Sequence, residues 1–231
     1  MCYSFKTSLI SYSLGMLSAL FALCTRQYIL GILILFYTQI QLSEAMIWYG
    51  IDTRRNEWNR IGTAYGKYLL PTHNIAIGLG ILFLAYRNTG TPLLGPLILG
   101  ILFYLYVILV EYRKKHPDST YPGDPMCTRQ DCQNDKNRLV WPFPQRWYVV
   151  SIFLSLFLLI RYIRPWSSVV FFVTLFFITF FQSLFLFRSS MSSVWCFSAA
   201  VLAPVLVVGN YFILHKTAWA GSGTVSRSTF V

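Results

Sequence analysis

Long stretches without charged residues alternate with short polar segments along most of this chain. Two of them, 165–187 and 189–214, are separated by Arg188 alone. About 20 consecutive apolar residues are enough for a helix to cross the roughly 30 Å hydrocarbon core of a bilayer. The pattern therefore predicts an all-α fold, a polytopic transmembrane helix bundle with seven helices. The expected spans are 7–25, 28–49, 68–86, 92–112, 147–162, 166–187 and 191–214.

The fifth of these spans is the shortest. Its uncharged part, 147–160, has 14 residues, a length that also fits a re-entrant or interfacial segment. Arg146 and Arg161 bracket it, and long basic side chains at the ends of a short span reach outward to the headgroups. We expect it to span the membrane; otherwise the bundle has six helices.

The composition agrees with that of a membrane protein and limits the classes of partner that we expect. Hydrophobic residues make up 55% of the chain and charged residues 12%, against about 25% charged residues in a typical soluble domain. The net charge is +11, but the basic residues lie mostly between the apolar stretches. This placement predicts contact with the lipid bilayer and its anionic headgroups, and it argues against nucleic acid as a partner.

The distribution of Lys and Arg predicts the orientation, because cytosolic loops carry the excess of these residues. With seven spans, 13 basic residues share the face of the amino terminus and 6 lie on the other face. The amino terminus is therefore expected in the cytosol and the carboxyl terminus on the opposite side. Loss of the fifth span would return the carboxyl terminus to the cytosol.

Residues 1–216 are expected to form a single helix-bundle domain, followed by a disordered tail over 217–231. The largest polar segment, 113–146, contains five prolines and no periodic pattern. It predicts an irregular connection that either is simply solvated or docks a protein partner. Cys127 and Cys132 within it are expected to be free thiols in a reducing compartment, although a local disulfide is an alternative.

Polar residues in the predicted spans gather toward the cytosolic end. Tyr37, Gln41, Glu44 and Trp48 follow helical spacing and share one face of the second span. Ionisable residues inside a membrane usually face the bundle interior or a wet cavity. We expect a polar, cytosol-facing vestibule with Glu44 at its centre. Its other ligand-binding candidates are Gln41, His73 and Glu111. The alternative is that these side chains only anchor helix ends at the interface.

Catalytic and metal-binding patterns are weak. Cys2 is a candidate thiol, but no His is fixed beside it, so an inert thiol is the favoured interpretation. Cys127, Cys132 and His116 do not make a zinc ligand set. We therefore expect no metal and no cofactor, and lean against an enzyme.

The residues Met1-Cys2-Tyr3-Ser4, with Gln41, Glu44 and Trp48 in the second span, resemble an uncharacterised multi-pass membrane family of bacteria and large DNA viruses. Members typically begin Met-Cys-Phe-Ser-Ala and carry Gln-x-x-Glu-Gly before a Trp. The chain departs from that pattern at Tyr3, Phe5 and Ala45. The resemblance covers about the first 50 residues and adds weight to Cys2, Gln41 and Glu44, but implies no activity.

Two functions remain. In the first, the chain binds or passes a small polar ligand, an ion or a lipid headgroup at the Glu44 vestibule. In the second, it is a structural membrane protein, for example of a viral internal membrane. Its basic loops, 50–67 and 113–146, would then dock a protein shell.

Overall fold

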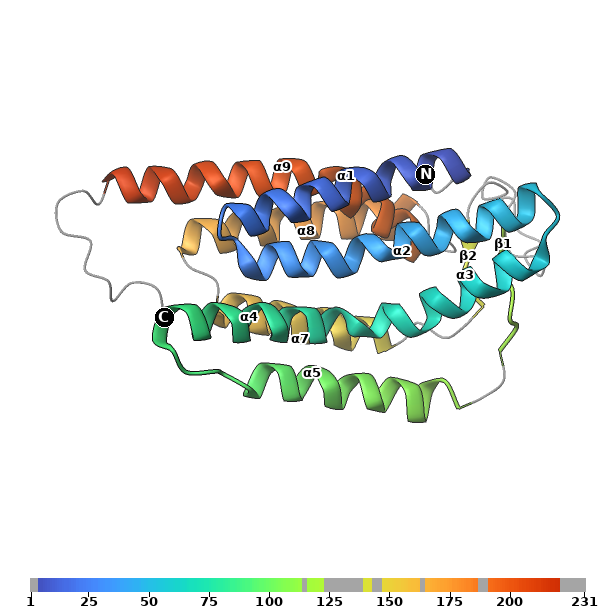
Figure 1. The fold of residues 1–231 in the computed structure, drawn as a ribbon, viewed down its shortest axis with the longest axis horizontal. Coiled ribbons are helices and arrows are strands. Elements are labelled where there is room, and N and C mark those ends of the chain that lie inside the picture. The colour runs from blue at the N-terminus through green and yellow to red at the C-terminus, as the bar shows by residue number, and fades with distance from the viewer. Residues whose placement is uncertain are drawn as a thin grey trace.

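The computed structural model describes residues 4–113, 116–122, 139–142, 147–162, 165–186 and 191–220. Helices make up most of this part of the chain, in agreement with the all-α class, and lie side by side along one direction (Figure 1). The helical elements are α1 (Phe5–Cys24), α2 (Tyr28–Asp52), α3 (Asn56–Leu69), the 3₁₀ turn η1 (Leu70–Thr72), α4 (His73–Thr89), α5 (Gly95–Tyr106), the π-helical turn η2 (Val107–Glu111), α7 (Trp147–Tyr162), α8 (Trp166–Leu186) and α9 (Met191–Ala220).

Five helical stretches in the described residues are long and apolar enough to cross a membrane, which indicates a membrane protein. They are Phe5–Cys24, Tyr28–Asp52, Asn56–Thr89, Trp166–Ser183 and Phe197–Leu214. Two shorter apolar helices, Gly95–Glu111 and Phe153–Tyr162, lie beside them. The short segment 147–162 is thus helical, as expected.

The connection expected at 50–67 is instead largely helical. α2 continues to Asp52, and α3 begins at Asn56 after a turn in which Arg54 has a φ of 57°. Through η1, α3 continues into α4, so that 34 residues form one rod about 51 Å long at 1.5 Å per residue. This length exceeds the roughly 30 Å thickness of a bilayer core.

Small residues set the distance between α1 and α2. A Cβ atom on Gly15 would collide with the side chain of Thr38, and one on Gly31 would meet Leu23. The ring of Phe5 lies 5.7 Å from that of Tyr49 at the far end of the pair. Such small-residue contacts are how helices approach closely in membranes, where lipid provides no hydrophobic drive between them. α1 and α2 therefore form a tight antiparallel pair.

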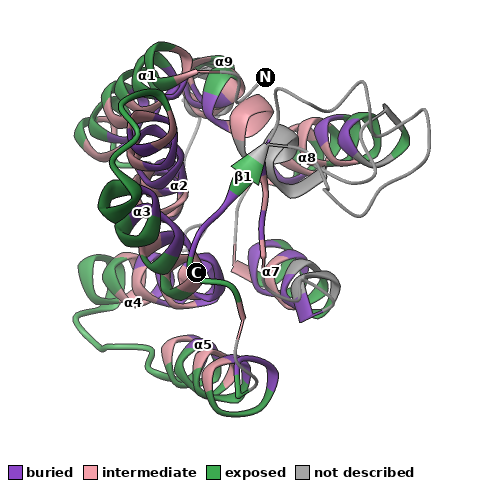
Figure 2. Ribbon diagram, turned by 90° about the vertical axis from the view of Figure 1, so that its right-hand side faces the viewer, coloured by how far each residue is buried: buried purple, intermediate pink, exposed green. Residues whose placement is uncertain are grey.

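The middle of the bundle lies between α2, α4, α7, α8 and α9, and α5 packs outside α4 (Figure 2). One apolar cluster joins α1, α2 and α9 through Ala19, Ile34 and Val207. At the same end, the buried Gln27 side chain donates to the carbonyl of Val207 at 3.2 Å and accepts from Asn210 at 2.6 Å. These contacts fasten α9 to the α1–α2 turn.

Of the segment 113–146, the structure describes residues 113, 116–122 and 139–142, most of them without regular secondary structure. β1 (Tyr121–Pro122) pairs antiparallel with β2 (Leu139–Val140). The segment leading to β1 crosses the end of the bundle (Figure 2). Cys127 and Cys132 lie outside the described residues. α9 continues to Ala220, so residues 217–220 of the expected tail are helical, and 221–231 lie outside the described residues.

Candidate functional site

The polar stripe of α2 is buried in the bundle. Gln41 and Glu44 have no exposed surface, and Trp48 is 6% exposed. The helix places them there because it packs against α1, α3, α4 and α9, which leaves it little surface of its own. The helical spacing of these residues therefore identified an inward-facing stripe correctly.

The side-chain amide of Gln41 is the least satisfied polar group of this stripe. Within the described residues, neither its Nε2 nor its Oε1 has a hydrogen-bond partner, and the same holds for Trp48 Nε1. Ser8 Oγ of α1 is another buried atom of this kind. Buried polar atoms normally find partners, and leaving them unpaired is unfavourable. These atoms offer a ligand three kinds of hydrogen-bonding group.

His73 contacts the α2 stripe directly. Its ring stacks on that of Tyr37, with 4.7 Å between centroids and 28° between the planes. Pro71 in η1 marks the point where the rod passes from α3 to α4, and His73 is the first residue of α4. The structure therefore brings His73 to the helical turn of α2 that precedes Gln41.

Asn74, next to His73, connects α4 to α7. Its Nδ2 donates to Ser151 Oγ at 2.9 Å, and its Oδ1 accepts from Ser155 Oγ at 2.8 Å. Asn74 is fully buried and Ser151 is nearly so. The pair Ser151 and Ser155, four residues apart in a short apolar stretch, was missed in the sequence, although this spacing places both on one helix face.

Glu111 lies farther out, at the end of the outer α5–η2 helix. The π-helical turn, closed by the bond from Tyr112 N–H to the Val107 carbonyl at 3.0 Å, holds Glu111 8% exposed. Its Oε1 accepts from Tyr106 Oη of the same helix at 3.1 Å. Val107 and Tyr112, at the two ends of this turn, belong to the same apolar cluster as Trp48. Glu111 is therefore linked to the α2 stripe through this cluster.

An apolar cluster closes the end of the bundle beyond Glu44. It includes Trp48, Leu139, Trp141 and Trp147. A Cβ atom on Gly66 would collide with the Trp141 ring, so the glycine allows this indole to pack against α3. The vestibule expected at this end is thus closed to solvent in this structure, with its central carboxyl group inside.

A cavity lies on the other side of the Tyr37–His73 stack. Its volume is about 110 Å³, counted as the space open to the centre of a water-sized molecule, which is room for several waters. Residues of α2, α4, α7, α8 and α9 line it, most of them apolar. Tyr37 and His73 belong to its lining, whereas Gln41 and Glu44 do not.

Most of the thiol and metal candidates, Cys2, Cys127 and Cys132, lie outside the described residues. No group of three or more His, Cys, Asp or Glu side chains within them is arranged to hold a metal ion. Cys24 is an exposed free thiol. Cys2 lies outside the described residues.

No protein-family model, curated protein or solved structure matches this chain significantly.

Proposed function

We propose that this chain is a multi-pass integral membrane protein that binds a polar ligand or a lipid headgroup at the buried stripe of Gln41 and Glu44. The bundle crosses the membrane seven times, with the amino terminus and α3 on the cytosolic side. The basic residues at the α3 end, which include Arg54, Arg55 and Arg60, support this orientation.

The observation that carries the proposal is the combination of a fully buried carboxyl group with a fully buried amide that lacks partners within the described residues. An ionisable side chain inside a membrane protein is costly and is kept where it interacts with a partner, an ion or a substrate. The Gln41 amide both donates and accepts, as recognition of a polar head requires. His73 lies at the cavity end of this site.

A structural role is the second candidate, and the length of the α3–α4 rod supports it. α3 extends beyond the bilayer core. Arg60 on α3 and Arg54 and Arg55 in the turn before it are exposed, and Arg60 pairs with Asp118 of the segment 116–122. A basic, rigid projection of this kind is suited to docking an acidic protein shell. Charge reversal at Arg54 and Arg55 tests this role, because it leaves the Glu44 site intact.

Native mass spectrometry of the detergent-purified chain tests the binding function. Glu44→Gln keeps the shape of the side chain but removes its charge, and Gln41→Leu removes the amide. We expect wild-type protein to carry a co-purifying small molecule that both variants lose. Glu57→Gln, at a carboxyl group that is exposed on α3, is the matched control and should retain it. Equal retention by all four proteins, or no retained molecule in any, would reject the proposal.

A further inference from the structure

The buried stripe of α2 is covered at the α3 end by a part of the chain that lies outside the helices. This part consists of the segments 116–122 and 139–142, which together we call the strap. β1 lies in the first segment and β2 in the second, and their antiparallel pairing places Tyr121 opposite Val140. The segment leading to β1 crosses the end of the bundle (Figure 2).

Side chains of the strap pack beside the part of α2 that holds Glu44. Leu139 has no exposed surface, Trp141 is 5% exposed, and both belong to the apolar cluster at this end of the bundle. The members of that cluster on α2 are Ile40, Ile47 and Trp48. Glu44 lies four residues after the first of these and three and four residues before the others, so it shares their helix face. Removal of the strap would therefore uncover the turn of α2 that carries Glu44.

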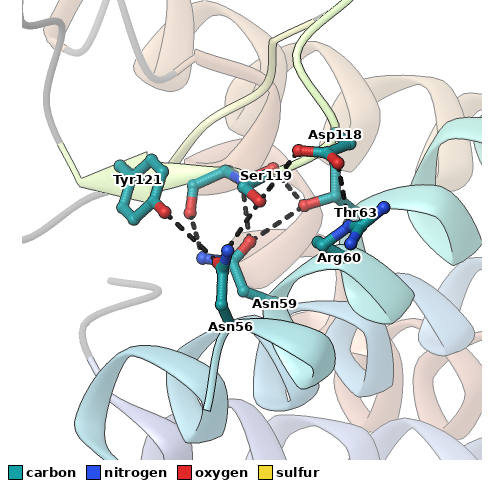
Figure 3. Close-up of polar contacts among 8 residues, drawn as sticks. Asn56, Asn59, Arg60, Thr63, Asp118, Ser119 and Tyr121 are labelled. Atoms are coloured by element: carbon teal, nitrogen blue, oxygen red, sulfur yellow. Dashed lines mark hydrogen bonds and ion pairs between the residues drawn. The ribbon is translucent and has the colours of Figure 1, made fainter. Parts of the chain in front are cut away.

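Polar contacts fasten the strap to α3, and most of them involve one residue. The Thr120 N–H donates to Asn59 Oδ1 at 2.8 Å, and the Thr120 carbonyl accepts from Asn59 Nδ2 at 2.7 Å. The hydroxyl oxygens of Thr120 and Thr63 are 2.7 Å apart. Tyr121 Oη donates to Asn56 Oδ1 at 3.3 Å (Figure 3). These bonds come from side chains of α3, so they can break while the backbone hydrogen bonds of the helix stay intact.

The strap has little secondary structure of its own to hold it in place. Each of its strands has two residues, and an isolated pair of strands is marginally stable at best. Segments of this kind open at a smaller free-energy cost than packed helices do. α2 and α3, in contrast, are held in close contact at Gly62 and Gly66. Of the described elements at this end, the strap is therefore the one that moves away from the stripe most easily.

We propose that the strap is a gate, which leaves α3 to admit a polar ligand to Gln41 and Glu44 from the α3 end. This inference rests on the proposed function, because it assigns the route by which the ligand of that site enters. In the closed form, which the structure shows, the Trp141 ring packs against Gly66 and excludes water from the stripe. Opening breaks the hydrogen bonds of Thr120 and moves the Trp141 ring away from α3.

A disulfide bond that locks the strap to α3 tests the gate without any ligand. Thr63→Cys and Thr120→Cys are combined in a variant whose native cysteines are serines. The 2.7 Å between the two hydroxyl oxygens brings the replacing sulfur atoms within bonding reach. Gln41→Cys supplies a reporter thiol, which [2-(trimethylammonium)ethyl] methanethiosulfonate modifies from the water. Because modification requires an open strap, the protein in nanodiscs should react at least about tenfold more slowly after oxidation with diamide than after reduction. Equal rates in the two states overturn the inference.

A second cysteine pair controls for oxidation itself. Ser4→Cys with Thr7→Cys replaces two hydroxyl groups whose oxygens are 3.0 Å apart at the start of α1. The disulfide bond of this pair constrains α1 alone, so oxidation should leave the rate at position 41 unchanged. Equal slowing by both pairs would show that the oxidation, and not the strap, controls access, and would overturn the inference.

The substitution Trp141→Ala tests the gate in the opposite direction. Its indole fills the space beside Gly66, so its removal should speed modification at position 41 at least about tenfold. Trp166→Ala is the matched control, because this indole is 59% exposed on α8. An unchanged rate in Trp141→Ala, or an equal increase in both variants, overturns the inference. The disulfide lock keeps the gate testable if Trp141→Ala fails to fold.

Modification at position 41 requires no ligand, so it separates the gate from the function on which it rests. If Glu44→Gln loses a co-purifying molecule while the locked and reduced proteins react at equal rates, the proposed function stands and the gate is rejected. If the locked protein reacts more slowly but no protein retains a molecule, the strap moves as proposed and the binding function is rejected.

Discussion

Single buried polar residues hold neighbouring helices together in this bundle. Asn74 is the clearest case, because the nitrogen and the oxygen of its side-chain amide each form a hydrogen bond with a hydroxyl group of α7. Apolar packing between α4 and α7 through Ile77 and Leu159 is non-directional, whereas the two hydrogen bonds fix the rotation of α7. That rotation places Ser151 and Ser155 on the cavity side.

Asn74→Ala should lower the free energy of unfolding by about 1–2 kcal/mol. Hydrogen bonds between membrane helices average about 0.6 kcal/mol, with values up to about 1.7, and this substitution removes two of them. Reversible unfolding of the purified protein in mixed detergent measures the loss. A double-mutant cycle with Ser155→Ala should give a coupling near 0.6 kcal/mol, and additive effects would show that the Asn74–Ser155 bond contributes nothing.

The residues of the α2 stripe could be predicted from the sequence, whereas their surroundings could not. Helical spacing alone places Gln41 and Glu44 on one face, and the cost of burying them in lipid directs that face inward. The stacking of His73 on Tyr37 depends on where α3 passes into α4, which no local pattern gives. Ser151 and Thr179 read as isolated hydroxyl groups in apolar helices until the fold brings them to one level.

At the scale of elements, polar contacts and close-packed glycines together hold the buried face of α3. Gly62 and Gly66 allow α3 to approach α2, where Ser43 Oγ donates to the Gly62 carbonyl at 2.6 Å. From the same face, Asn59 Nδ2 donates to the Thr120 carbonyl at 2.7 Å. Asn59 Oδ1 accepts from Thr120 N–H at 2.8 Å, within the network of Figure 3. The segment 116–122 is thereby fastened to α3.

The sequence did not predict the helix α3, because the residues that form its buried face are of types that also occur in loops. Asn, Gly and Thr have low helix propensity and are typical of loops, and they supply the buried face at Asn59, Gly62 and Thr63. Contacts with α2 and with Thr120 outweigh that propensity. The long apolar helices needed no such help, so their existence followed from hydropathy alone.

Asn59→Leu should release the segment 116–122 from α3. It removes both hydrogen bonds to Thr120 and leaves the buried N–H and carbonyl of Thr120 without partners. The free-energy cost of burying these unpaired groups exceeds the stabilisation that the two hydrogen bonds provide. We expect faster hydrogen exchange over 116–122 and over β2. Arg60→Ala is the control in the next position, because its ion pair with Asp118 at 2.8 Å joins side chains that are 59% and 66% exposed. Exposed pairs contribute about 0–1 kcal/mol, so exchange should change little. Similar exchange in both variants would contradict the role of Asn59.

At the scale of the whole molecule, the two ends of the bundle differ in charge and in structure. One end holds α3, the small sheet and the residues Arg54, Arg55 and Arg60. The other end holds the short turns after α1 and α4, with Arg26 and Arg87, and the ends of α7 and α9, with Arg161 and Lys216. The buried Glu44 lies toward the first end. The charges at the two ends and the polar lining of the cavity thus point in the same direction along the bundle.

Cysteine labelling in intact cells tests this direction. In a variant whose native cysteines are replaced by serine, a single cysteine at Thr91, in the exposed turn after α4, should react with an impermeant maleimide from outside. A single cysteine at Arg54, in the turn before α3, should react only after the cells are opened, because the basic face is retained in the cytosol. A cysteine after α9 discriminates seven spans from six, since an odd number places it outside together with Thr91. Labelling of Arg54 from outside would reverse the orientation, and equal access for Arg54 and Thr91 would mean that α4 does not cross the membrane.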